Sequence, residues 1–206
     1  MMDELLRSAR LIAILRKLPF SHMAAAGEAL YAGGVRLAEV TMESDNALAA
    51  IDVLRQQGLT VGAGTVLDGE TAERAIAHGA VFLVTPCIRA DVIETARKHR
   101  VPVITGTLTP TEIWTAYELG STYVKVFPAG SLGPAYIRDV MGPLGHVPLV
   151  PSGGVTLDNA RSFLDAGAIA VGVGSALTDR KLLENHDFAG LAERARAYVR
   201  AVAAGV

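Results

Sequence analysis

The sequence predicts an α/β protein with a single, compact (β/α)8 fold, a TIM barrel, in which residues 1–206 form one domain that begins with a short N-terminal helix. Eight short apolar runs recur at intervals of roughly 20–28 residues, and a stretch of helical composition lies after each run. The runs are apolar throughout, as parallel strands are when helices cover the sheet. A chain of 206 residues is long enough to enclose such a core.

The eight predicted strands are rich in aliphatic and β-branched residues. They are residues 11–15, 35–40, 59–64, 80–85, 101–105, 122–127, 147–151 and 168–174. Eight consecutive β–α units are typical of a closed barrel. An open, doubly wound sheet is the alternative, but that fold requires a glycine-rich phosphate loop after the first strand, and the sequence there is LRKLPF.

The predicted helices lie between and after the strands. They are residues 21–32, 45–57, 69–78, 90–99, 110–119, 133–141, 156–166 and 187–203. Glycine follows several of them directly and supplies the left-handed conformation that often ends a helix. Four side chains are predicted to cap helix N-termini, namely Asp45, Asp91, Thr109 and Thr156.

Composition excludes several function classes. The net charge of −2 provides no basic surface for nucleic acid, and no apolar run approaches the ~18 residues of a membrane helix. The N-terminus lacks the apolar region of a signal peptide. Cys87 is the only cysteine, which excludes an internal disulfide, and the five histidines show no metal-ligand spacing. We therefore expect a cytoplasmic protein without metal or cofactor, and without a nucleic-acid or membrane partner.

Polar residues lie at the C-terminal ends of the predicted strands, where TIM barrels carry their active sites. They are Arg16, Glu39, Thr41, Thr65, Thr85, Thr105, Lys125 and Ser152. Side chains alternate along a strand, which places Arg16 with Ile12 and Ile14, Glu39 with Val35 and Leu37, Thr65 with Val61 and Ala63, and Lys125 with Tyr123 and Phe127. If these faces point into the barrel, then Arg16, Glu39, Thr65 and Lys125 meet at one mouth.

Lys125 is the most informative of these residues, because it interrupts an otherwise apolar strand, YVKVFPAG. Burying an ammonium group is costly, whereas a neutral amine can attack a carbonyl. Glu39 could move protons, and Arg16 offers two parallel donors to a carboxylate. This set favours Schiff-base chemistry on a keto acid. A structural Glu39–Lys125 ion pair, with Thr65 as a turn residue, is the alternative.

Two glycine-containing loops follow the last two strands, PSGGV at 151–155 and VGVGSAL at 171–177. Glycines allow backbone N–H groups to approach an anion, and barrels of this type commonly bind phosphate at these two loops. The candidate phosphate-binding residues are Ser152, Gly153, Gly154, Gly174 and Ser175.

Taken together, these residues resemble one family of class I aldolases, the 2-keto-3-deoxy-6-phosphogluconate (KDPG) / 4-hydroxy-2-oxoglutarate (KHG) aldolases. The resemblance extends from LIAILR to VGVGSAL. It is carried by EVT (39–41), GAGTVL (62–67), TP (85–86), VKVFPAG (124–130), LGPAYI (132–137) and PSGGV (151–155).

The resemblance implies cleavage of a phosphorylated 2-keto-3-deoxy sugar acid to pyruvate and glyceraldehyde 3-phosphate by a homotrimer. Small keto-acid and aldehyde-phosphate molecules would then be the partners. The implied roles are Schiff-base formation for Lys125, acid/base catalysis for Glu39 and carboxylate binding for Thr65. Phosphate binding is implied for Gly153, Gly154 and Ser175, and pocket lining for Pro86, Gly106 and Phe127.

One departure from the family pattern concerns the substrate carboxylate. Many members read EVTLRT, with an arginine placed for this group, whereas this chain reads EVTMES and has Glu43 there. Arg16 lies at the end of the first strand, as in galactonate-type members, and could take over this contact. Gluconate, galactonate and 4-hydroxy-2-oxoglutarate substrates therefore remain open. A barrel isomerase without a covalent intermediate, and a catalytically inactive binding barrel, are further alternatives.

Overall fold

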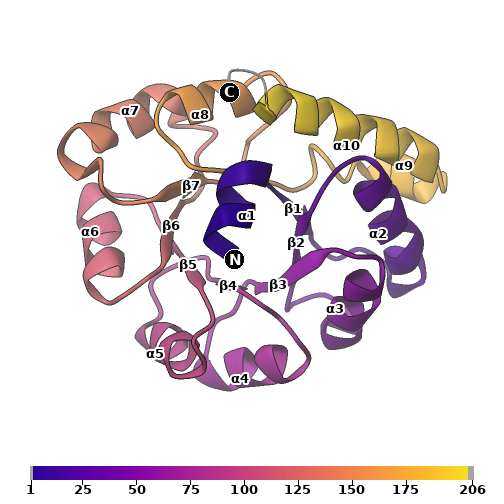
Figure 1. Ribbon diagram of the computed structural model, residues 1–206, viewed down its shortest axis with the longest axis horizontal. Helices are drawn as coiled ribbons and strands as arrows, with labels where there is room; N and C mark the ends of the chain where they lie inside the picture. The colour runs from indigo at the N-terminus through magenta and orange to yellow at the C-terminus, as the bar shows by residue number, and fades with distance from the viewer. Residues whose placement is uncertain (1, 204–206) are drawn as a thin grey trace.

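Eight parallel strands form a barrel surrounded by helices in the computed structural model, which describes residues 2–203 (Figure 1). The strands are β1 (Leu11–Leu15), β2 (Leu37–Thr41), β3 (Thr60–Gly64), β4 (Leu83–Val84), β5 (Val103–Thr107), β6 (Tyr123–Val126), β7 (Leu149–Pro151) and β8 (Val171–Val173). Their order is β7-β6-β5-β4-β3-β2-β1-β8. A parallel bridge between Ser152 and Gly172 joins the two outer strands and closes the barrel. The predicted fold class is confirmed.

The helices lie outside the strands, apart from the first. They are α1 (Met2–Ala9), α2 (Met23–Ala32), α3 (Ala47–Gln56), α4 (Gly69–Ala77), α5 (Ala90–His99), α6 (Pro110–Glu118), α7 (Gly133–Leu144), α8 (Ala160–Asp165), α9 (Arg180–Glu184) and α10 (Phe188–Ala203). A 3-10 turn, η1 (Phe20–His22), precedes α2. Helix α9 has no counterpart among the predicted elements, whereas η1 overlaps the start of the predicted helix 21–32. No helix within residues 2–203 has the length and apolar character needed to cross a membrane.

Only one of the four predicted helix caps is confirmed. Thr109 caps α6, since its hydroxyl accepts a hydrogen bond from the backbone N–H of Glu112. Asp45 precedes the cap of α3, Asp91 lies inside α5, and Thr156 lies four residues before the start of α8. The Asp91 carboxylate instead accepts a hydrogen bond from the backbone N–H of Gly69, at the start of α4.

The core has two layers. Aliphatic side chains fill the space between the barrel and the outer helices, and a second cluster fills the barrel interior. The interior cluster comprises Leu6, Ile12, Leu37, Phe82, Val84, Ile104, Tyr123, Val150 and Ala170. Because side chains alternate along a strand, the next inward positions are Glu39 after Leu37, Lys125 after Tyr123 and Ser152 after Val150. The inner face is therefore apolar toward the N-terminal end and polar toward the C-terminal end.

Strand β3 faces the opposite way from the prediction. Val61 and Ala63 belong to the outer layer, so Gly62 and Gly64 face the interior. A Cβ atom on Gly62 would lie 2.3 Å from the ring of Phe82, and one on Gly64 would lie 1.9 Å from Oε1 of Glu39. Phe82 and Glu39 thus occupy the space beside β3, which leaves no room for side chains on that face.

Helix α1 lies across the centre of the ring of strands (Figure 1). Its Leu6 is fully buried in the interior cluster. The Tyr123 hydroxyl donates a 3.0 Å hydrogen bond to Oδ1 of Asp3, and Arg7 bonds the other oxygen of the same carboxylate. This contact fixes α1 to β6, two residues before Lys125.

Tyr123→Phe should lower the free energy of unfolding by about 1–2 kcal/mol, because it removes a hydrogen bond to a charged acceptor that is partly exposed. For a chain of this size the melting temperature should fall by about 2–8 °C. The measurement is calorimetry on both proteins. Tyr31→Phe is the control, since that side chain is exposed on α2. Equal shifts for the two variants would show that the Tyr123 contact does not stabilise the barrel.

Candidate active site

Lys125 lies within β6 and points into the barrel. It is 5% exposed and pairs in register with Gly106 of β5 and Val150 of β7. Its Nζ lies 4.9 Å from the centre of the Phe127 ring. The apolar cluster beneath it begins with Tyr123, which belongs to the same strand. The lysine is thus held at the boundary between the apolar and polar halves of the interior.

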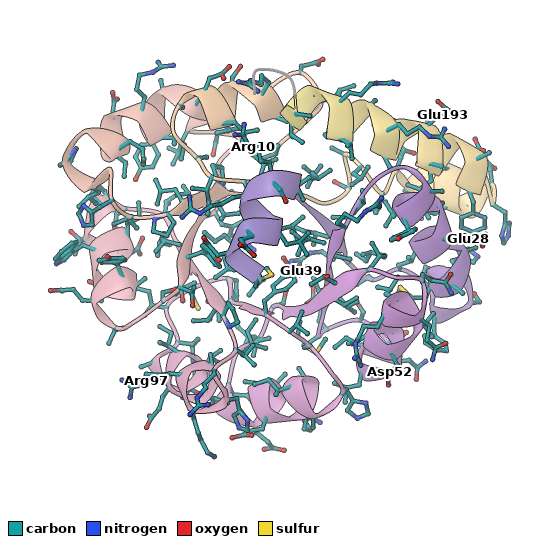
Figure 2. All side chains as sticks on the ribbon, viewed as in Figure 1. Arg10, Glu28, Glu39, Asp52, Arg97 and Glu193 are labelled. Atoms are coloured by element: carbon teal, nitrogen blue, oxygen red, sulfur yellow. The ribbon has the colours of Figure 1, made fainter. Side chains whose placement is uncertain are left out.

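Glu39 occupies the corresponding position on β2, between Ile14 of β1 and Gly62 of β3. Figure 2 shows it near the barrel axis, whereas Glu28 and Arg97 lie on the outer helices. It is 2% exposed, and its Oε1 has no hydrogen-bond partner among the described residues. Burial raises the pKa of Glu39; the positive charges of Lys125 and Arg16 oppose this rise. A carboxyl group with a raised pKa is suited to taking up and releasing a proton near neutral pH.

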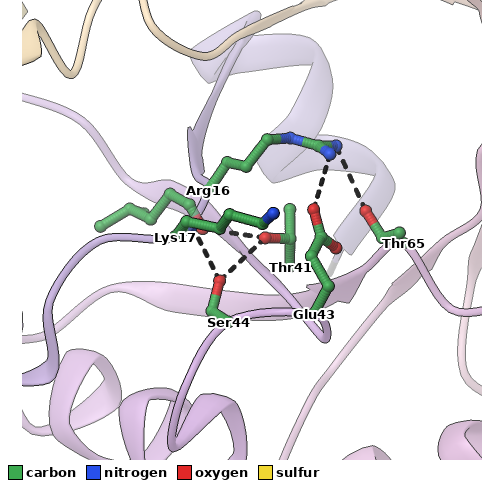
Figure 3. Close-up of polar contacts among 7 residues, drawn as sticks. Arg16, Lys17, Thr41, Glu43, Ser44 and Thr65 are labelled. Carbon is green, nitrogen blue, oxygen red and sulfur yellow. Dashed lines mark hydrogen bonds and ion pairs between the residues drawn. The ribbon is translucent and has the colours of Figure 1, made fainter.

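Arg16 and Thr65 meet at the mouth of the barrel, as predicted (Figure 3). Thr65 does not reach it by regular strand alternation, however. Nη2 of Arg16 donates a 3.2 Å hydrogen bond to Oγ1 of Thr65. Regular alternation after Gly64 would turn Thr65 away from the axis. A φ angle of +54° at Thr65 places it in the left-handed region and breaks this alternation.

Glu43 is also part of this contact. Its Oε1 accepts a 2.6 Å hydrogen bond from Nη1 of Arg16, so the guanidinium joins the loops after β1, β2 and β3. The hydroxyl of Ser44 supports the same corner by accepting from the backbone N–H of Lys17 and by pairing with Thr41. The acid that replaces the family arginine is therefore the ion-pair partner of Arg16.

A cavity of about 910 Å³ opens at this end of the barrel. Eight predicted site residues line it, namely Arg16, Lys125, Phe127, Ser152, Gly153, Gly154, Gly174 and Ser175. Glu39 and Thr65 do not line this cavity; Thr65 and Glu43 border a second one of about 640 Å³ beside α3 and α4. Pro86 and Gly106 line neither: a Cβ on Gly106 would lie 2.3 Å from the backbone of Pro86, so these two residues pack on each other.

The loop after β7 needs both of its glycines. Gly153 and Gly154 have φ angles of +78° and +80°, which glycine adopts without strain. A Cβ on Gly154 would lie 2.7 Å from Cα of Gly130, and the backbone N–H of Gly130 donates to the carbonyl of Gly153 at 2.7 Å. The loops after β6 and β7 are thereby fastened together along one side of the cavity.

The sequence analysis did not identify two residues, Gly64 and Glu43, as part of the site. Gly64 was visible in GAGTVL, but the sequence does not reveal that its missing side chain leaves room for Glu39. Glu43 was visible as an acid in EVTMES, and its ion pair with Arg16 joins residues 27 positions apart. Within residues 2–203, no three His, Cys, Asp or Glu side chains are grouped as metal ligands would be.

Comparison with known proteins gives consistent matches. The sequence profile of the family described as KDPG and KHG aldolase matches residues 2–193. The chain is 32% identical over 190 residues to a 2-dehydro-3-deoxy-phosphogluconate aldolase of Pseudomonas aeruginosa, covering 91% of this chain and 86% of the relative. It is 34% identical over 172 residues to a 2-dehydro-3-deoxy-6-phosphogalactonate aldolase of Escherichia coli K12, covering 81% of this chain and 83% of that relative.

A solved structure agrees with these matches. The 2-keto-3-deoxy-6-phosphogluconate aldolase of Zymomonas mobilis ZM4, crystallised with 3-phosphoglycerate, superimposes with a TM-score of 0.86 at 29% identity. The superposition covers 98% of both chains.

The raised pKa of Glu39 predicts how stability depends on pH. Above its ordinary value of 4.5, the unfolded chain releases a proton that the folded protein still holds, so the wild type loses stability as pH rises from there through the folded-state pKa. Glu39→Gln cannot titrate. The melting temperature of this variant minus that of the wild type should therefore increase as pH rises above about 4.5, and the difference should then become constant. Melting curves from pH 4 to 9 measure this, and a difference that does not change with pH would contradict it.

Proposed function

Because this chain belongs to the KDPG and KHG aldolase family, we propose that it is a class I aldolase that cleaves 2-keto-3-deoxy-6-phosphogluconate into pyruvate and glyceraldehyde 3-phosphate. The observation that carries the proposal is the buried Lys125, which lines the cavity and shares the barrel interior with a buried glutamate. A buried ion pair contributes little stability by itself, which favours a functional role for both residues.

The proposed reaction begins at Lys125. Its neutral amine attacks the C2 ketone, and loss of water from the carbinolamine gives an iminium. The C3–C4 bond then breaks, its electron pair moves toward the iminium nitrogen, and an enamine forms. Glu39 accepts the proton of the C4 hydroxyl, directly or through water, as that carbon becomes the aldehyde. Protonation of the enamine at C3 and hydrolysis release pyruvate and the free lysine.

The surroundings of Glu39 support its role in both proton transfers. Its raised pKa makes the carboxylate a stronger base for the C4 proton. The same proton is then available for C3 of the enamine. Oε1, which has no partner among the described residues, is free to bond a hydroxyl or a water molecule. An ion-paired carboxylate would have to break its existing contact first.

The two ends of the substrate are assigned to different loops. We place the carboxylate near Arg16 and Thr65, after β1 and β3, and the phosphate at Ser152, Gly153, Gly154, Gly174 and Ser175, after β7 and β8. Lys125 lies on β6, which in the sheet order stands between β7 of the phosphate region and β3 of the carboxylate region. A cavity of about 910 Å³ has room for a six-carbon phosphorylated acid.

The galactonate epimer is a second candidate substrate. Arg16 at the end of β1 and the acid at position 43 favour it, because the resemblance places an arginine at the end of the first strand in galactonate-type members. The 34% identity to a phosphogalactonate aldolase also supports it. Measuring kcat/KM for both epimers and for 4-hydroxy-2-oxoglutarate distinguishes the candidates.

We further propose a cytoplasmic homotrimer, as the family resemblance implies. Trp114 and Tyr117 on α6 are more than a third exposed and contact the His146 ring edge-on, which provides an aromatic patch for an interface. Light scattering at several concentrations tests the oligomeric state.

Incubation with pyruvate and borohydride should leave one reduced pyruvyl group on the peptide that contains Lys125, because the iminium is reducible. Peptide mass analysis locates it. Lys17 lines the same cavity and is the matched control: Lys17→Arg should retain the adduct, whereas Lys125→Arg should lose the adduct and all turnover. An adduct on Lys17, Lys98 or Lys181, or no adduct, would refute the covalent mechanism.

Gly64→Ala should lower kcat by about 100-fold while the protein stays folded, since the new Cβ displaces the Glu39 carboxylate. The backbone of Gly64 is not left-handed, so alanine fits it. Gly62→Ala is the control: it presses on Phe82 and should lower stability by about 1–3 kcal/mol with little change in kcat. Turnover assays and melting curves measure both effects. Unchanged turnover in Gly64→Ala would show that the position of Glu39 does not matter.

A further inference from the structure

The guanidinium of Arg16 is already bound to a carboxylate in the free protein. Nη1 donates to Oε1 of Glu43 at 2.6 Å, and Nη2 donates to the hydroxyl of Thr65 at 3.2 Å. Figure 3 shows both bonds leaving the same end of the guanidinium. That end is the one that binds a carboxylate through two parallel N–H groups. Glu43 therefore occupies a position that suits the carboxylate of a keto acid.

We propose that Glu43 is a specificity-determining residue: an internal carboxylate that occupies Arg16 and that the substrate carboxylate must displace. The identity of that substrate rests on the proposed function; the competition for Arg16 rests on the contact itself. Glu43 would then weaken binding of pyruvate and of other small carboxylates at this end of the cavity.

The exposure of the pair makes this exchange feasible. The Arg16 side chain is 50% exposed and that of Glu43 is 28% exposed, so water can solvate either partner after separation. Ion pairs of this kind contribute little net stability. A fully buried pair would be far harder to open. Arg16 also lines the large cavity, so it can reach an incoming ligand there.

Thr65 allows the exchange without leaving Arg16 unsupported. Its hydroxyl remains bonded to Nη2 when Nη1 changes partners. The displaced Glu43 stays near the mouth, because it lies two residues after the end of β2, and its charge continues to repel the bound anion. Both effects act in the same direction and together predict a two- to tenfold weaker affinity for a carboxylate, on the order expected for exposed charges.

A purely supporting role for Glu43 predicts a change in carboxylate affinity of the opposite sign when the residue is removed. If the residue only held Arg16 in a binding orientation, its removal would weaken carboxylate binding. The sign of the change in affinity therefore separates the two roles.

The experiment compares Glu43→Gln with the wild type in two measurements. One is the pyruvate concentration that gives half-maximal borohydride trapping on Lys125. The other is the calorimetric dissociation constant of oxamate, which has the shape of pyruvate but carries an amide that does not form an imine. Both values should fall about two- to tenfold in Glu43→Gln.

Glu184→Gln is the matched control. Glu184 also pairs with an arginine, Arg180, at 2.6 Å and also borders the large cavity, but from α9. This variant removes the same charge and should leave oxamate affinity within twofold of the wild type. In an Arg16→Ala background, Glu43→Gln should give a smaller gain in oxamate affinity than in the wild type, because the competition for Arg16 is gone and only the repulsion by the Glu43 charge is relieved.

Three results would overturn the inference: an unchanged or weaker oxamate affinity in Glu43→Gln, a full gain in the Arg16→Ala background, or no oxamate binding to either protein. Failure of the proposed function has a separate signature, which is no pyruvate adduct on Lys125 in the wild type. The oxamate titrations still decide the role of Glu43 in that case.

Discussion

Burial of Glu39 and Lys125 inside the barrel is the constraint to which the rest of the structure responds. Each side chain is removed from water at the boundary between an apolar and a polar half of the interior. Removing charges from water is costly, so the surrounding barrel must provide enough stability to hold them there. The apolar half supplies this through tightly packed side chains and through α1, which closes the end of the barrel opposite the cavity.

The same constraint explains the glycines along the inner face. Gly62 and Gly64 leave space for Phe82 and Glu39, and Gly106 allows the backbone of Pro86 to approach. Glycine in a strand weakens it, because it contributes no packing of its own. Here neighbouring side chains fill the space that the glycines leave, and this packing offsets the loss. The Phe82 ring fills it in the core, and the Glu39 carboxylate fills it in the site. Packing and site geometry are thus set by the same few positions.

Sequence patterns were sufficient for the fold and for the place of three candidate residues in it. Eight apolar runs and the inward alternation on β1, β2 and β6 placed Arg16, Glu39 and Lys125 correctly. On β3 both faces are small and apolar, so alternation alone could not tell which one points inward, and Val61 and Ala63 were assigned to the wrong face. The Arg16–Glu43 contact also could not be predicted from the sequence, because it depends on how two loops approach each other whose contacting residues are 27 positions apart.

Glu43 affects both charged centres of the site. Its negative charge pairs with Arg16 and, through space, contributes to the raised pKa of Glu39. An acid at this position therefore reduces the pull of the mouth on anions and helps Glu39 keep its proton. An arginine there would do the reverse on both counts, because its positive charge would attract the carboxylate and favour the ionised form of Glu39. The residue type at position 43 thus links the anion affinity of the mouth to the proton affinity of Glu39.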